Sequence, residues 1–356
     1  MKDRGHAVVP WLGSPVAALL DALPDPALIV DAAGTVQLAN AEAVRLFDAA
    51  ETPTPVAFLL RAPDVLEAVE QAAGAGARAR VRHHQRTPVE RWIEVHVAPV
   101  EVGVAEGDRA VLLVLHDLTQ AERLERMRAD FVANASHELR TPLASLSGFI
   151  DTLQGAARND AAARAEFLVI MRAQAARMSR LIEDLLSLSR IELNEHVPPQ
   201  GMVDLGEAAA RVVEGLRPLA ASEGVKLVLD RPVRAVAIRG DGDELDRLIE
   251  NLVENGIKYG APGKRVEVAV ATTTDGTAPK AVLAVRDFGP GIAAEHLPRL
   301  TERFYRVDVG ESRAKGGTGL GLALVKHITS RHRGRLAIES KPGEGALFTV
   351  RFDLAG

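Results

Sequence analysis

Two runs of apolar residues near the middle of the chain constrain its fold more than any other feature. Members of the first run alternate four and three residues apart, and they are Leu139, Leu143, Leu146, Ile150 and Leu153. The second run follows a loop at 155–160 and has a similar spacing, with Phe167, Met171, Met178, Leu181, Leu185 and Leu188. Heptad spacing predicts two helices, each with an apolar seam. Because one helical pair cannot bury both seams, we expect two chains to form a four-helix bundle. The alternative is a hairpin that packs on the rest of its own chain.

The first of these helices carries a histidine within the stretch Phe131–Pro142. His137 and Thr141 are four residues apart and therefore share a helix face. Pro142 has no N–H for the carbonyl of Glu138, so we expect the helix to bend there. A neutral imidazole is a good nucleophile, and Glu138 is expected to hold its other ring nitrogen. Taken alone, the stretch also fits a surface histidine on an amphipathic helix.

The last third of the chain contains a polar helix face followed by a carboxylate between a strand and glycines. Asn251 and Asn255 are four residues apart, with Lys258 and Tyr259 just after them. Amide oxygens suit Mg²⁺, and a lysine suits phosphate. Farther along, the stretch Asp287–Gly291 follows an apolar strand. Its carboxylate can accept a hydrogen bond from an adenine amino group, while Gly289 and Gly291 let the backbone approach the base.

Two further stretches complete the pattern. An aromatic and basic stretch, Glu302–Arg306, lies in a long loop. That loop ends in glycines at the start of an apolar helix, in the order Gly317, Thr318, Gly319, Leu320 and Gly321. Glycines at a helix N-terminus expose N–H donors to phosphate. Each motif alone is weak, but there is no Walker A sequence, and no His-Arg-Asp loop precedes Asp287 as it would in a Ser/Thr/Tyr kinase.

In order and spacing these motifs resemble the phosphoacceptor box and the N, G1, F and G2 boxes of sensor histidine kinases, over roughly residues 120–354. The ATP domain of that family shares its fold with gyrase and Hsp90. The resemblance implies that ATP lies between the Asn255 helix and the loop 292–318, which would act as a lid with Gly310, Gly316 and Gly317 as hinges. It implies Asn255 for Mg²⁺, Asp287 for adenine, and Lys258 and Arg306 for the phosphates. His137 would accept the γ-phosphoryl group and pass it to an aspartate of a response-regulator receiver domain, with Thr141 serving its dephosphorylation.

Residues upstream of the hairpin suggest a sensory domain. Short strands and helices alternate from 15 to 118, and the opening Leu23–Asn40 and the closing His116–Thr119 resemble a PAS domain. His83 and His84, flanked by Arg82 and Arg86, are expected to be solvent-exposed rather than metal or haem ligands. The arrangement is most similar to that of phosphate-responsive members of the histidine kinase family.

The overall prediction is a multidomain α+β protein in four parts. These are a leader at 1–14, a PAS-like α/β domain at 15–118, a dimerisation and phosphoacceptor hairpin at 119–196, and an α/β two-layer sandwich that binds ATP at 203–356. The 356 residues carry a net charge of −5 and no cysteine. This composition argues against nucleic acid as a partner and excludes disulfides and thiolate sites. A cytoplasmic homodimer is expected, with membrane association only if an anchoring segment lies outside this chain.

Two other functions fit some of the same motifs. A scaffold that binds ATP only as an allosteric ligand is disfavoured by the intact His137, Asn255 and Asp287. An ATPase machine of the gyrase or Hsp90 kind is disfavoured by the phosphoacceptor hairpin.

Overall fold

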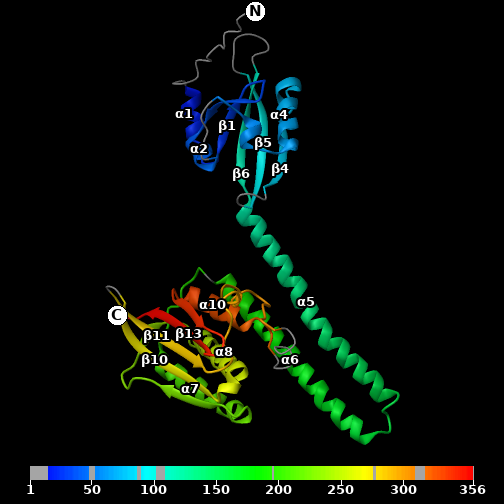
Figure 1. Ribbon diagram of the computed structural model, residues 1–356, viewed down its shortest axis with the longest axis vertical. Coiled ribbons are helices and arrows are strands. Elements are labelled where there is room, and N and C mark those ends of the chain that lie inside the picture. Colours follow the sequence, from blue (N-terminus) through cyan, green and yellow to red (C-terminus); the bar gives the residue numbers. More distant parts are fainter. Residues whose placement is uncertain are drawn as a thin grey trace, which may run out of the picture. The chain divides into compact units, whose positions relative to one another are not determined.

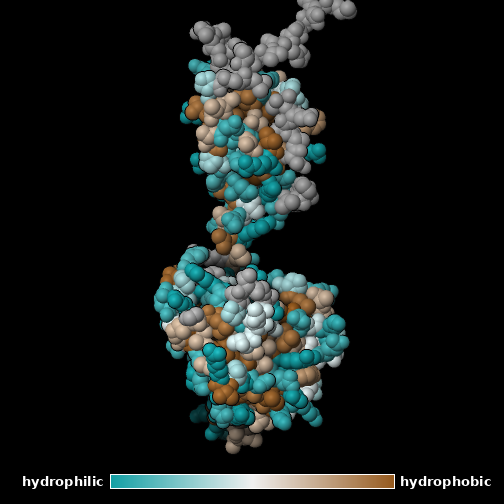
Figure 2. Space-filling model, turned by 90° about the vertical axis from the view of Figure 1, so that its left-hand side faces the viewer, coloured by the Kyte–Doolittle hydropathy of each residue, from teal (hydrophilic) through white to brown (hydrophobic). Residues whose placement is uncertain are grey.

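The structure is a computed structural model with two compact units, residues 1–130 and 131–356. It describes residues 15–47, 53–85, 90–101, 109–194, 196–275, 278–308 and 317–355. The expected leader and the hinges Gly310 and Gly316 lie outside these ranges. On the face drawn in Figure 2, hydrophilic and hydrophobic residues are interspersed over both units. None of the described helices is both long enough and apolar enough to span a membrane.

The N-terminal unit is an antiparallel sheet with the strand order β3-β2-β1-β6-β5-β4. The strands are β1 (Ala27–Val30), β2 (Thr35–Ala39), β3 (Thr54–Pro55), β4 (Ala79–Gln85), β5 (Arg91–Glu101) and β6 (Arg109–Asp117). The helices are α1 (Pro15–Asp21), α2 (Ala41–Phe47), α3 (Val56–Leu59) and α4 (Pro63–Ala75). Helix α4 contributes Val65 and Val69 to a core shared with Leu28, Val95 and Leu113 of the sheet. Short strands and helices alternate as predicted, and the fold class is the expected one.

His84 is not the solvent-exposed side chain that the sequence suggested. Its ring stacks on Trp92 at 4.0 Å between centroids, and its Nε2 lies 2.8 Å from a Glu90 carboxylate oxygen. The side chain is consequently only 24% exposed. His83 is half-buried as well. Antiparallel pairing of β4 with β5 causes this, because it places His84 directly opposite Trp92.

Two long helices form the predicted hairpin, α5 (Thr119–Gln154) and α6 (Ala161–Leu193). Asp160 caps α6 by accepting hydrogen bonds from the N–H groups of Ala162 and Ala163, which explains why the helix begins there. Helix α5 continues through Pro142. The Thr141 hydroxyl donates to the carbonyl of His137 at 3.2 Å, one turn before the proline.

The apolar seams of the hairpin are divided between two environments. Leu181 and Leu188 are buried in the core of the C-terminal sandwich, and Leu139 and Leu185 pack against that core. Leu143 and Ile150 remain 54% and 42% exposed. The chain's own sandwich thus covers part of the seams, as the alternative of a hairpin packed on its own chain predicts, and the exposed part remains for the predicted second chain.

The C-terminal sandwich has a sheet with the strand order β12-β13-β11-β10-β8. Its strands are β8 (Lys226–Asp230), β10 (Arg265–Asp275), β11 (Ala278–Asp287), β12 (Arg335–Ser340) and β13 (Ala346–Asp353). The pairing is antiparallel except between β8 and β10. Helices α7 (Leu205–Ser222), α8 (Gly242–Gly260) and α10 (Gly321–Arg331) form the second layer (Figure 1). The two-layer architecture was predicted, whereas the small sheet of β7 (Met202–Asp204) and β9 (Ala237–Arg239) was not.

Candidate functional site

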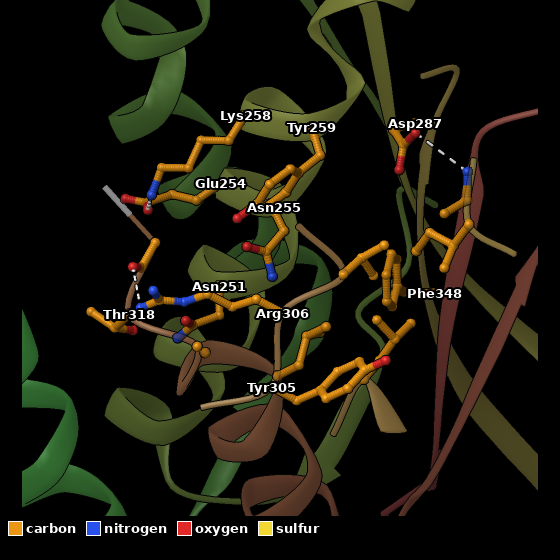
Figure 3. A pocket seen from close by; sticks show the side chains of 18 of the residues that line it. Asn251, Glu254, Asn255, Lys258, Tyr259, Asp287, Tyr305, Arg306, Thr318 and Phe348 are labelled. Atoms are coloured by element: carbon orange, nitrogen blue, oxygen red, sulfur yellow. Dashed lines mark hydrogen bonds and ion pairs between the residues drawn. The ribbon is translucent and has the colours of Figure 1, made fainter. Parts of the chain in front are cut away.

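A cavity of about 340 Å³ opens between α8, the ends of the loop 292–318 and the hairpin helix α6. Figure 3 shows Asn251, Asn255 and Tyr259 along one wall, with Asp287 and Phe348 across the cavity from them. Most of the residues predicted for the site line it, namely Asn251, Asn255, Lys258, Tyr259, Asp287, Gly291, Arg306, Gly317, Thr318, Gly319 and Gly321. The structure thus brings together motifs that are far apart in the sequence.

Helix α8 directs its polar side chains into the cavity because its other face is apolar. Asp241 caps the helix, and Leu248, Leu252 and Ile257 are completely buried. The opposite face carries Asn251 and Asn255, as their spacing predicted. The Asn251 amide nitrogen donates to the carbonyl of Arg247 at 2.8 Å, which orients its oxygen away from the helix's own backbone.

Asp287 lies at the end of β11 and is nearly buried. Its Oδ1 accepts hydrogen bonds from the N–H groups of Gly289 at 2.9 Å and Ala346 at 3.3 Å. Among the described residues no donor is bonded to Oδ2. Burial raises the pKa of the Asp287 carboxyl above its ordinary value, and these two N–H donors oppose the rise. A single free acceptor oxygen in a largely apolar wall suits a neutral donor on a ligand.

Glycines let the backbone close around Asp287. Gly291 has φ = +71°, and a Cβ there would lie 1.9 Å from the carbonyl oxygen of Lys341. Gly289 does not line the cavity itself. Instead it packs on the end of α8, where a Cβ would lie 2.7 Å from the carbonyl oxygen of Tyr259. Gly289 therefore has a packing role that fixes the loop after β11, and its place beside a bound base stays a prediction.

The described ends of the loop 292–318 bring a cation and a hydroxyl to the cavity. Arg306 is only 5% exposed and donates to the carbonyl of Gly317 at 2.8 Å. Thr318 and Gly319 precede α10, whose N-terminus faces the cavity through Gly321. A Cβ at Gly321 would lie 2.4 Å from the Asn251 amide oxygen, so the helices α8 and α10 approach closely there. Leu320 is fully buried in the core and anchors this segment rather than lining the site.

Two cations of the cavity wall, Lys258 and Arg247, form ion pairs with carboxylates of the same wall. The Lys258 ammonium forms an ion pair with Glu254 one turn away. Among the described lining residues, six carboxylates face four cations. Burial raises the pKa of Glu250, and the neighbouring Glu254 carboxylate adds to the rise. The cavity therefore combines an acceptor for a neutral donor at Asp287 with a cation-containing end at Arg306 and Lys258.

The phosphoacceptor candidates lie on the hairpin, outside the cavity wall. His137 is exposed on α5. The Glu138 carboxylate is only 12% exposed and accepts hydrogen bonds from Arg177 at 3.0 Å and Arg306 at 3.1 Å. Adjacent residues of a helix do not face each other, so Glu138 points to these arginines, whereas the sequence suggested a bond to the His137 ring.

Sequence reasoning missed several residues of the cavity. Arg247 lies one turn before Asn251, and the same four-residue spacing could have identified it. Glu183, Asp184 and Arg180 come from α6, and no local pattern connects them with the distant motifs. Phe348, on the side of Asp287, was also missed (Figure 3). The other aromatic residue there, Tyr305, belongs to the predicted stretch Glu302–Arg306.

Three family models match the chain. Residues 20–123 match the PAS fold, residues 127–194 match the His Kinase A (phospho-acceptor) domain, and residues 240–356 match the histidine kinase-, DNA gyrase B- and HSP90-like ATPase. These matches agree with the resemblance on which the sequence-based predictions rest.

Two relatives illustrate how far the similarity extends. The phosphate regulon sensor protein PhoR of Pseudomonas aeruginosa is 34% identical over 99% of this chain and 76% of its own length. The sensor protein kinase WalK of Staphylococcus aureus is 34% identical over 69% of this chain and 57% of its own length. A crystal structure of the histidine kinase ThkA in complex with the response regulator protein TrrA covers 95% of this chain and 98% of that chain, with 16% identity and a TM-score of 0.48.

Replacing Asp287 tests the buried acceptor of the cavity. We predict that Asp287→Asn weakens binding of an adenine nucleotide about tenfold or more, because an amide N–H₂ would face the adenine amino group. Because the pKa of the wild-type carboxyl is raised and the ionised form accepts the hydrogen bond, affinity should decline as the pH falls through this raised pKa. The variant should lack this decline.

Calorimetric titration at several pH values measures both effects. Asp230→Asn, on an exposed residue of β8, is the matched control. Equal affinity of Asp287→Asn and the wild type would show that the adenine role is wrong.

Proposed function

Because the chain belongs to the sensor histidine kinases, we propose that it uses ATP to phosphorylate His137 and then transfers the phosphoryl group to an aspartate of a response regulator. The observation that carries this proposal is the presence, in one compact unit, of an exposed helical histidine and a cavity with both a buried acceptor and cationic donors. The match to a PhoR over nearly the whole chain supports a sensor that couples its N-terminal unit to this chemistry.

Each end of the cavity suits one end of ATP. Asp287 would accept the adenine amino group, and Arg306 would donate to the phosphates. Asn255 offers the amide oxygen that a hard cation prefers, so it would hold Mg²⁺ together with phosphate oxygens. Lys258 would reach the phosphates by exchanging its Glu254 partner for them. Neutralising and positioning the phosphates is the main requirement of phosphoryl transfer.

His137 supplies the nucleophile. One imidazole nitrogen would form the new P–N bond while the bond between the γ-phosphorus and the bridging oxygen of ADP breaks, and the imidazole then loses its proton to solvent or a nearby base. Since His137 lies outside the cavity wall, the reaction requires the hairpin and the cavity to approach in another arrangement or between two chains.

The identity of the acceptor can be tested directly. We predict that His137→Gln abolishes incorporation of label from γ-labelled ATP, because the nucleophile is lost, but leaves nucleotide affinity unchanged. His196→Gln, an exposed histidine just after the hairpin, is the control and should retain full incorporation. Residual stoichiometric label on the His137 variant would refute the assignment.

Thr141 is proposed to serve the reverse reaction. Its hydroxyl lies one turn from His137 and could orient water toward a phospho-aspartate on a docked receiver. Thr141→Ala should keep autophosphorylation within about threefold and slow dephosphorylation of the receiver by about tenfold or more. The bond from Thr141 to the His137 carbonyl also suggests a helix-stabilising role. In that case both rates would fall together, while Ser147→Ala, on the same helix, should alter neither rate.

The exposed part of the hairpin seam supports a homodimer. Leu143→Glu combined with Ile150→Glu should convert a dimer into a monomer of about 38.0 kDa, because the charges would be buried without partners in a four-helix bundle. Both side chains are exposed in the single chain, so the variant should still bind nucleotide. Leu185→Glu is unsuitable, because Leu185 packs on the sandwich core.

Light scattering measures the mass. Leu19→Glu combined with Phe58→Glu adds the same charge at exposed apolar residues of the N-terminal unit and should leave the dimer intact. A monomeric wild type would contradict the proposed assembly. The PhoR relative makes phosphate supply the first stimulus to test, by comparing receiver phosphorylation in phosphate-limited and phosphate-replete cells.

A further inference from the structure

Arg247 belongs to the cavity although none of the sequence motifs includes it. It lies on α8 one turn before Asn251 and two turns before Asn255, on the face that lines the cavity. Its guanidinium Nη2 donates to the Asp184 carboxylate at 2.8 Å. Its Nε is buried and has no hydrogen-bond partner among the described residues. A buried, charged donor without an acceptor is costly, so the site is incomplete without an anionic oxygen.

Asp184 holds two donors of the cavity at once. It projects from the hairpin helix α6, is 15% exposed, and accepts from the Thr318 hydroxyl at 2.8 Å in addition to Arg247. Thr318 comes from the glycine-rich segment before α10. A hairpin carboxylate therefore lies where it bonds two groups from two different walls of the cavity.

Glu138 binds Arg306 in the same way that Asp184 binds Arg247. It is the second hairpin carboxylate bonded to a cavity donor, and the Nε of Arg306 is likewise buried without a partner. Two carboxylates from α5 and α6 thus hold two guanidinium groups and a hydroxyl of the cavity. Donors of this kind bind phosphate equally well.

We propose that Arg247 is a further phosphate-binding residue of the nucleotide site, and that Asp184 competes with the nucleotide phosphates for it. The proposal rests on the proposed use of ATP. Six carboxylates against four cations make the present wall a poor site for a polyphosphate. When Asp184 moves away from Arg247 and Thr318, their donors become available to hydrogen-bond the phosphates. Nucleotide binding therefore exchanges one anion for another.

Opposite effects of the two partners distinguish competition from a structural ion pair. A purely structural pair predicts that loss of either partner weakens nucleotide binding or leaves it unchanged. Competition predicts that loss of Arg247 weakens binding whereas loss of Asp184 strengthens it. Because Asp184 acts through Arg247, the gain should shrink when both residues are replaced.

The test is titration of the full chain with Mg²⁺ and a non-hydrolysable ATP analogue. Arg247→Gln should raise Kd about tenfold, and Asp184→Asn should lower it about threefold or more. Arg172→Gln and Glu166→Gln, exposed residues of α6 outside the cavity, are the matched controls and should leave Kd unchanged. Thermal unfolding without nucleotide identifies any variant that is misfolded, and Arg247→Lys then replaces Arg247→Gln.

Opposite shifts in Kd support the proposal. An unchanged Kd in both variants, or a shift of the same sign, overturns it while leaving the proposed kinase function intact. Asp184→Asn remains decisive on its own, since a weaker or unchanged affinity in that variant overturns the competition. Failure of the wild type to bind the analogue would instead overturn the proposed function, and this inference with it.

Discussion

Two carboxylates of the helical hairpin, Glu138 and Asp184, accept hydrogen bonds from the donors that a nucleotide phosphate would need. Whether the cavity can offer those donors to a ligand depends on these bonds. They join α5 and α6 to Arg306, Arg247 and Thr318. Apolar contacts of Leu181 and Leu188 with the sandwich core support the same arrangement. The hairpin is therefore held against the sandwich by both burial and charge.

If phosphates and hairpin carboxylates compete for one set of donors, nucleotide binding and hairpin docking must oppose each other by equal free energies. Glu138 gives this coupling a chemical consequence, because it is the neighbour of His137. Phosphate bound to Arg306 would release Glu138 beside the nucleophile, where it could serve as a base. Loss of the docked contacts would also let His137 move relative to the cavity, which the proposed transfer requires.

Local patterns in the sequence predicted the parts of this site that depend on local geometry. The spacing of Asn251 and Asn255 placed both on one face of α8, and the position of Asp287 after an apolar stretch placed it at the end of a strand, which is the central strand β11. Local patterns could not predict which residues pair when they are far apart in the sequence. Asp184 and Arg247, which are hydrogen-bonded, are 63 residues apart in the sequence. Lys258 forms its ion pair with Glu254, one turn away in the same helix. The burial of Leu181 and Leu188 likewise depends on how the sandwich packs on α6, which heptad spacing does not determine.

The exchange can be observed as a distance, and the absence of cysteine from the chain makes labelling specific. Ser189→Cys on α6 and Ser222→Cys at the end of α7 place one spin label on the hairpin and one on the sandwich, both at exposed positions. Pulsed electron resonance should give one well-defined distance without nucleotide and a longer or broader distribution with a non-hydrolysable ATP analogue and Mg²⁺. An unchanged distribution at saturating nucleotide would contradict competition between the hairpin carboxylates and the phosphates.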